Sequence, residues 1–416
     1  MLMDGEGREV RISVQGLALG MFVSRLDRPW LDSPFPLEGL ALESEDDVAK
    51  LKRICSHVWV DTGRGRSPEL RFFEFESLPR GDGGKEEFER LRKARWTIES
   101  GFTAELARAD GIHASLEAGI AEVMRDLEAG KRLDLERLKD GVEAMVDSIL
   151  RNPTAFVWLA QMKQADTYTY QHALGCAIWS ASLGRHLGLE RGELGVLAMG
   201  GLLSDIGKSR LPAALLVKPE PLSPDEVELV RDHVRHSLEI VATAPDLSHE
   251  VVAIVATHHE RYDGSGYPNG LRGTDIPIFG RIVGMVDSYD AMTSVRPYAS
   301  NRSPHDAVNE LYRHRGTQFQ AELVEQFIQN CGIYPIGTLV ELSDGTVGVI
   351  TEVHSLKRLR PRIMLLLGPD KSPMPKFREI NLGEVERNAE GVPLMVKRGL
   401  PFGAFGLDPA ELFLAS

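Results

Sequence analysis

The stretch from Val251 to Pro268, Val-Val-Ala-Ile-Val-Ala-Thr-His-His-Glu-Arg-Tyr-Asp-Gly-Ser-Gly-Tyr-Pro, is the most informative part of this chain. It places two adjacent histidines, His258 and His259, at the end of an apolar helical segment and follows them with a glycine-rich turn. Adjacent imidazoles are costly in a core, because each brings two polar nitrogens that must be paired when buried. A metal ion pairs them, since neutral imidazole is the commonest protein ligand of transition metals. The stretch therefore predicts a metal site at the end of a helix.

Further metal-ligand candidates lie on other predicted helices and follow apolar residues at helical spacing. They are His172, Asp205, His233 and Asp287. The helix that carries His233 has a clear start, because Ser223, Pro224 and Glu226 form a capping box with proline at the first helical position. Helical proteins build metal centres from imidazoles and carboxylates on the inner faces of several helices. Two divalent ions bridged by a carboxylate suit the hydrolysis of phosphodiesters.

Each candidate also has an ordinary structural interpretation. A single histidine such as His172 is more often a hydrogen-bonded core residue, and Asp205 alone could simply end a helix. The joint occurrence of the candidates favours metal binding, since several unrelated accidents would have to coincide. Other histidines are interpreted as surface or core residues: His57, His113, His186, His249, His305, His314 and His354.

The composition is that of an ordinary globular protein with two or three domains, at 416 residues with 43% hydrophobic and 26% charged residues. The net charge of −13 argues against general nucleic-acid or membrane-surface binding. The longest apolar run, Val251 to Ala256, is far too short to span a membrane, and no secretory signal is visible. Three scattered cysteines match no zinc or redox spacing, which predicts reduced thiols in a cytoplasmic protein.

The pattern along the chain predicts a mainly α fold with β-rich ends. Residues 10–62 alternate short apolar runs with turn residues, as the strands of a small domain do. Helical periodicity extends from 86 to about 331, and residues 338–353 carry a strong hairpin signal. The predicted parts are an N-terminal domain with a linker (1–85), a helical connecting region (86–150), a helical metal-binding domain (151–332) and a β-rich C-terminal segment (333–416).

These residues resemble the HD-GYP family, a branch of the HD phosphohydrolases, over roughly residues 150–330. The resemblance lies in His172, the Asp205-Ile-Gly-Lys208 run, His233, the segment from His258 to Pro268, and the segments from Val286 to Thr293 and from Arg296 to Tyr298. The Gly-Tyr-Pro segment with its flanks is highly specific. Residues 11–62 resemble the uncharacterised domain that often precedes HD-GYP. The resemblance implies a helical HD-type bundle for the central part.

The resemblance also implies hydrolysis of the bacterial second messenger cyclic di-GMP at a centre of two divalent transition-metal ions, iron or manganese. In this chain His172, Asp205 and Asp287 would hold the first metal, and His233, His258 and His259 the second, with Asp205 as the bridge. Asp205 and Lys208 would be the catalytic residues. The substrate would be contacted by Lys208, Arg296, Tyr267 and Asp290.

The chain departs from the family at Ser204, which stands where the family's His-Asp pair has its histidine. The first metal site would lose an imidazole and be weakened or empty. Tyr168 stands where some members have a glutamate for a third metal, which argues against a trinuclear site. The first hypothesis is an active phosphodiesterase, and the alternative is an impaired member that binds cyclic di-GMP or a partner as a sensor or adaptor. A different HD-type phosphohydrolase is a third option. A homodimer or a signalling-protein partner is left open.

Overall fold

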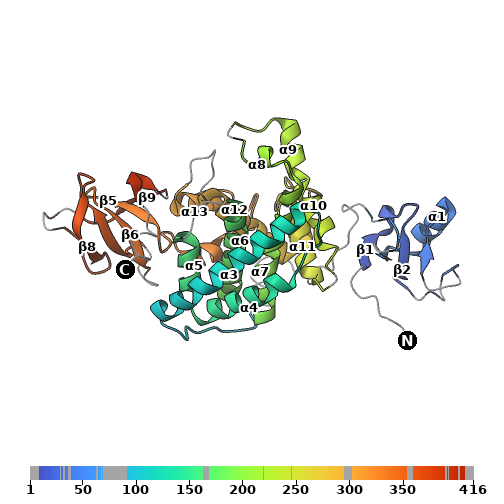
Figure 1. The fold of residues 1–416 in the computed structure, drawn as a ribbon, viewed down its shortest axis with the longest axis horizontal. Helices are drawn as coiled ribbons and strands as arrows, with labels where there is room; N and C mark the ends of the chain where they lie inside the picture. The colour runs from blue at the N-terminus through green and yellow to red at the C-terminus, as the bar shows by residue number, and fades with distance from the viewer. Residues whose placement is uncertain are drawn as a thin grey trace.

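The computed structural model comprises a small β-rich unit, a helical body and a C-terminal sheet, which follow one another along the long axis of Figure 1. It describes residues 9–28, 30, 33–35, 39–61, 64–66, 68, 91–162, 168–218, 220–244, 246–294, 302–353, 359–388, 391, 393–401 and 403–407. Within these ranges no helix is both long enough and apolar enough to cross a bilayer. The three cysteines are buried and form no disulfide in the structure.

The N-terminal unit is a four-stranded antiparallel sheet of order β1-β4-β2-β3, which confirms the strands predicted for 10–62. Its strands are β1 (Glu9–Ser13), β2 (Phe22–Leu26), β3 (Leu40–Ala41) and β4 (His57–Asp61), and helix α1 spans Glu45–Ile54. Alternate residues of the strands, such as Ile12, Val23 and Val58, are fully buried in one core with Leu51 of α1. Period-two alternation thus gives this sheet one apolar face.

The helical body contains the predicted metal ligands. Its helices are α3 (Phe102–Glu128), α4 (Glu136–Arg151), α5 (Pro153–Met162), α6 (Tyr168–Leu187), α7 (Arg191–Leu203), α8 (Ala213–Leu216), α9 (Pro224–Arg231), α10 (His233–Val241), α11 (His249–Thr257), α12 (Ile278–Thr293), α13 (Pro304–Arg313) and α14 (Ala321–Cys331). Helices α3 and α4, which fall in the predicted connecting region, share one hydrophobic core with α6, α7, α11 and α12. The predicted boundary at residue 150 therefore lies inside this shared core.

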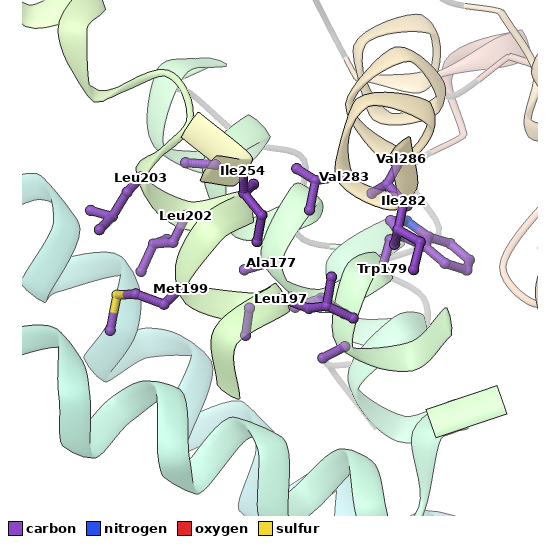
Figure 2. Packing of buried hydrophobic residues seen from close by; sticks show 14 of the residues in the cluster. Ala177, Trp179, Leu197, Met199, Leu202, Leu203, Ile254, Ile282, Val283 and Val286 are labelled. Carbon is purple, nitrogen blue, oxygen red and sulfur yellow. The ribbon is translucent and has the colours of Figure 1, made fainter. Parts of the chain in front are cut away.

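The central helices pack closely enough to bring their polar ends together. Figure 2 shows Leu197 and Leu202 of α7 beside Ala177 of α6 and Ile254 of α11, with Val283 of α12 nearby. A side chain at position 201 would not fit, because a Cβ on this glycine would lie 2.9 Å from the backbone of residue 176. The small residue lets α7 lie directly against α6.

Two helices end just before predicted metal ligands. Helix α7 ends at Leu203, and a short 3-10 turn (Ile206–Arg210) follows Asp205. The single helix predicted to run through His233 is broken into α9 and α10 at Asp232. The His233 imidazole donates to the Val230 carbonyl at 2.7 Å, so this side chain competes with the backbone for a helical acceptor.

The C-terminal unit is a five-stranded antiparallel sheet of order β8-β7-β6-β5-β9. Its strands are β5 (Leu339–Leu342), β6 (Val347–Glu352), β7 (Arg362–Leu367), β8 (Pro373–Asn381) and β9 (Val396–Leu400). Strands β5 and β6 pair through Leu339 and Val349, which confirms the predicted hairpin. The turn uses Gly345 at a positive φ of 88°, where glycine has no Cβ penalty. The mainly α fold with β-rich ends is confirmed.

A buried ion pair joins α3 to α4 and supports a stability prediction. The Glu105 carboxylate is fully buried and accepts hydrogen bonds from Ser148 (2.7 Å) and from Arg151 Nη2 (2.7 Å). Burial alone would raise the pKa of Glu105, but these partners outweigh it and lower the pKa from 4.5 to about 2. Glu105→Gln should therefore reduce the free energy of unfolding at pH 7 by about 2 kcal/mol.

The pH dependence of that loss has a definite sign. The pKa of Glu105 is depressed in the folded state. The stabilisation that the ionised carboxylate provides is therefore complete above the unfolded pKa, and it disappears as the pH falls from about 4.5 towards 2. Urea unfolding of the parent and of Glu105→Gln at pH 7 and pH 3 measures the loss of unfolding free energy at each pH. A Glu105→Gln variant as stable as the parent at pH 7 would contradict the prediction.

Candidate metal centre

The six predicted metal ligands converge on one buried centre. They come from α6 (His172), the turn after α7 (Asp205), the start of α10 (His233), the end of α11 (His258 and His259) and α12 (Asp287). Their ligand atoms form two groups, each with all atoms within 4.8 Å of one another. One group is Asp205, His233, His258 and His259, and the other is His172, Asp205 and Asp287. These are the two sets expected from the resemblance, and Asp205 belongs to both.

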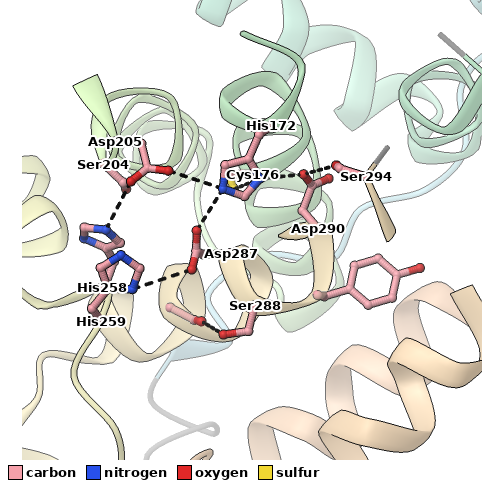
Figure 3. A network of polar contacts seen from close by, with 12 residues as sticks. His172, Cys176, Ser204, Asp205, His258, His259, Asp287, Ser288, Asp290 and Ser294 are labelled. Atoms are coloured by element: carbon pink, nitrogen blue, oxygen red, sulfur yellow. Dashed lines mark hydrogen bonds and ion pairs between the residues drawn. The ribbon is translucent and has the colours of Figure 1, made fainter. Parts of the chain in front are cut away.

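The two carboxylates lie between the imidazoles, as Figure 3 shows. Asp205 Oδ2 is 3.4 Å from His172 Nε2, and Asp205 Oδ1 is 3.1 Å from His233 Nε2. Asp287 Oδ1 is 3.0 Å from His172 Nε2, and Asp287 Oδ2 is 3.8 Å from His259 Nδ1. Asp205 thus reaches both groups with different oxygens, which is the geometry that a bridge between two cations requires, whereas Asp287 belongs to the His172 group alone.

Backbone carbonyls orient two of the imidazoles. His233 Nδ1 donates to the Val230 carbonyl at 2.7 Å, and His258 Nδ1 donates to the Val255 carbonyl at 2.9 Å. With the proton on Nδ1, the Nε2 lone pair of each ring faces the centre. His233 Nε2 lies 3.1 Å from His259 Nε2. Two imidazole nitrogens this close together can bind the same cation.

Two buried ligand atoms have no hydrogen-bond partner among the residues that the structure describes, namely Asp205 Oδ1 and His258 Nε2. A buried polar atom without a partner costs about 1–3 kcal/mol, and a metal ion would satisfy both. His258 is fully buried, and Asp205 is 6% exposed. The donor set of imidazole nitrogens and carboxylate oxygens fits a divalent transition metal.

Electrostatics keep the ligands in the protonation states that metals require. Burial would raise the pKa of Asp205, but the Lys208 ammonium and the neighbouring imidazoles of His172 and His233 outweigh it and hold the pKa well below its usual range. Burial lowers the pKa of His258 to about 4, although the nearby carboxylates oppose it. Burial and the neighbouring His258 likewise lower the pKa of His259. Asp205 is therefore anionic and the two histidines are neutral at pH 7.

Asp290 contacts the opposite nitrogen of the His172 ring from the one that meets Asp287. Its Oδ2 accepts from His172 Nδ1 at 2.8 Å and from the Ser294 hydroxyl at 2.9 Å. It is 7% exposed. A carboxylate on the far nitrogen of a ligating imidazole fixes the ring and raises its basicity. We therefore propose that Asp290 orients His172, while its contact with substrate stays a prediction.

The Gly-Tyr-Pro loop is anchored by Glu260, a residue that the sequence analysis did not select. The Glu260 carboxylate accepts from the backbone amides of Asn269 (2.7 Å) and Leu271 (2.9 Å), so it closes the loop over the end of α11. The Tyr267 ring stacks on His259 with centroids 4.7 Å apart, and the Arg231 guanidinium lies 4.9 Å from the Tyr267 centroid. The position of Glu260, directly after the two adjacent histidines, is the sequence feature that could have indicated this role.

Three further positions matter for the prediction: Lys208 and Arg296, which were predicted to contact phosphate, and Ser204, which replaces the family's histidine. The Lys208 ammonium contacts Asp205 Oδ2. Arg296 lies outside the described residues. The Ser204 hydroxyl donates to the Gly200 carbonyl of its own helix at 2.6 Å. The side chain of Tyr168 also lies outside the described part of the chain.

The helical fold and its shared-carboxylate site define a protein of the HD-domain class. Residues 154–323 match the family model described as HD domain, and residues 9–138 match a domain of unknown function, DUF3391. The chain is 32% identical over 375 residues to the cyclic di-GMP phosphodiesterase PA4108 of Pseudomonas aeruginosa, across 88% of this chain and 87% of that protein. The chain belongs to the HD-GYP family.

Two further similarities were found. The chain is 32% identical over 216 residues to the cyclic di-GMP phosphodiesterase response regulator RpfG of Xanthomonas campestris, across 52% of each chain. Among solved structures it is similar to Bd1817, a HDG"Y"P protein from Bdellovibrio bacteriovorus, with a TM-score of 0.46 and 19% identity. That alignment covers 77% of this chain and 98% of Bd1817.

Proposed function

We propose that this protein hydrolyses cyclic di-GMP at a centre of two divalent metal ions. The observation that carries the proposal is the pair of ligand groups that share Asp205 inside an HD-domain helical body. The relatives named as cyclic di-GMP phosphodiesterases support the choice of substrate. Iron or manganese fits the mixed imidazole and carboxylate donors.

Each residue has a proposed task in this reaction. His233, His258, His259 and Asp205 would hold one ion, and His172, Asp205 and Asp287 the other. Bound ions would lower the pKa of a coordinated water and polarise a phosphate oxygen. The Lys208 ammonium, 18% exposed and in contact with Asp205, would move to a phosphate oxygen when substrate arrives and neutralise its charge. Asp290 would keep His172 in its tautomer.

The second candidate function is a sensor that binds cyclic di-GMP without turnover. The orientation of Ser204 favours it, because the hydroxyl is committed to the Gly200 carbonyl and the first group has three ligands against four in the second. The first ion is therefore expected to bind more weakly than the second. Retention of both carboxylates and all four remaining imidazoles favours the enzyme.

Metal analysis combined with turnover separates the two functions. Protein purified with manganese would be assayed by plasma mass spectrometry for metal content and by chromatography for loss of cyclic di-GMP. The proposed enzyme gives more than one metal per chain and a linear dinucleotide or GMP as product. Tight binding of cyclic di-GMP with no product would establish the sensor. No metal and no nucleotide binding would refute both.

Restoring an imidazole at Ser204 should strengthen the first metal site. Ser204→His adds a ligand at the helix end that precedes Asp205, and we expect about 10-fold or more higher affinity for the weaker ion. Isothermal titration calorimetry with Mn²⁺ measures this affinity. Ser204→Ala is the matched control and should leave affinity unchanged, since the hydroxyl donates to a carbonyl of its own helix. Equal affinity in all three proteins would count against a weakened first site.

A further inference from the structure

A small cavity lies where the helical body meets the C-terminal sheet. Its walls come from α5, α6, α12 and the start of α13 on one side, and from β5, β9 and the turn before β5 on the other. The cavity has a volume of ≈ 30 Å³, which is enough for about two water molecules. A cavity of this size is too small for a nucleotide or a metabolite.

Three buried polar side chains border this cavity without a hydrogen-bond partner in the described part of the chain: Gln161, Tyr289 and Thr338. They are 8%, 1% and 1% exposed, and they come from α5, α12 and the residue just before β5. Unpaired buried groups from three separate elements rarely meet without a shared partner.

The same cavity touches the metal centre through Asp290. This residue lines the cavity and also accepts from His172 Nδ1 at 2.8 Å. Tyr289 precedes it on α12, and its ring packs edge-on against Trp179 with centroids 5.3 Å apart. The helix segment that carries Asp290 is thus bordered by the cavity on one side and by His172 on the other.

We infer that this cavity is a hydration site through which the C-terminal sheet supports the Asp290–His172 pair. Ordered water is the occupant that fits, because an amide, a phenol and an alcohol need a partner that both donates and accepts. The water would join Thr338 of the C-terminal unit to Gln161 and Tyr289 of the helical body. Thr338 would then be a positioning residue, and this part of the inference rests on the proposed metal centre.

Thermal unfolding of the full chain tests whether the cavity holds water. If water pairs the hydroxyls, Tyr289→Phe and Thr338→Val should each lower the unfolding midpoint by about 1–3 °C. The double variant should lose less than the sum, because the first substitution already disturbs the shared water. If the cavity is dry, removing an unpaired buried hydroxyl should instead raise the unfolding midpoint. A raised midpoint for Tyr289→Phe, or strict additivity, would overturn the hydration site.

Metal affinity tests the link to His172. Thr338→Val should weaken Mn²⁺ binding a few-fold, less than the roughly 10-fold or more that follows loss of a direct partner of a ligand. Thr351→Val is the control, since its hydroxyl lies on the same sheet and bonds Glu379 at 3.0 Å on the surface. An unchanged Mn²⁺ affinity in Thr338→Val would overturn the link. A parent protein that binds no Mn²⁺ would refute the metal centre itself, whereas the unfolding midpoints would still decide the hydration.

Discussion

Asp205→Asn is expected to remove metal from both groups of ligands and to abolish hydrolysis of cyclic di-GMP. Asp205 is the residue that the two groups share, with one oxygen 3.4 Å from His172 and the other 3.1 Å from His233. The amide keeps the size of the side chain but removes the anionic oxygens that two cations need. We expect metal content to fall to background and turnover to fall by at least about 100-fold. Plasma mass spectrometry of the purified variant measures the first effect.

Asp232→Asn is the matched control for this substitution. Asp232 is an exposed carboxylate directly before His233, and it forms an ion pair with Arg235 at 3.3 Å outside the centre. Its loss should leave metal content unchanged. Full metal occupancy in Asp205→Asn would show that Asp205 is not the bridge. Circular dichroism of both variants would confirm that the helices are retained.

Gly284→Ala is expected to disrupt the centre through packing alone. Gly284 lies on α12, where a Cβ would come 2.2 Å from the carbonyl oxygen of His258. A backbone atom cannot yield as a flexible side chain can, so α11 and α12 must move apart. We expect a loss of about 1–3 kcal/mol in the free energy of unfolding and a Mn²⁺ affinity at least about 10-fold weaker. Calorimetry and urea unfolding measure the two effects.

Gly195→Ala is the control for a glycine on a neighbouring helix. A Cβ at Gly195 of α7 meets no atom within 4 Å, so alanine should be neutral or should stabilise the protein by about 0.5–1 kcal/mol. A Gly284→Ala variant that binds Mn²⁺ as tightly as Gly195→Ala would contradict the close contact between α11 and α12.

The choice of candidate metal ligands was accessible to sequence analysis for a physical reason, whereas their division into two groups came from the resemblance. Each ligand follows apolar residues at helical spacing, so its direction relative to the core is set locally. The Gly-Tyr-Pro segment then linked this chain to a family whose ligand sets are known. The hairpin at β5 and β6 was equally local, because alternation and a turn sequence specify it.

Most of the features that the sequence did not reveal depend on contacts between segments far apart in the chain. The hydrogen bond between His172 and Asp290 spans 118 residues of sequence. The break before His233 is a local exception: its side chain donates to the Val230 carbonyl three residues earlier, a contact that the capping box and the apolar face do not encode. Glu105 lies on a helix, but its pairing with Arg151 depends on how α3 packs against α4. Local patterns give no information about such partners.

Anomalous diffraction from crystals grown with Mn²⁺ is the most direct measurement of the proposed centre. We expect one strong anomalous peak within bonding distance of His233, His258, His259 and Asp205. A second, weaker peak should lie within bonding distance of His172, Asp205 and Asp287. Absence of any ion within bonding distance of Asp205, with these side chains pointing apart, would contradict the account.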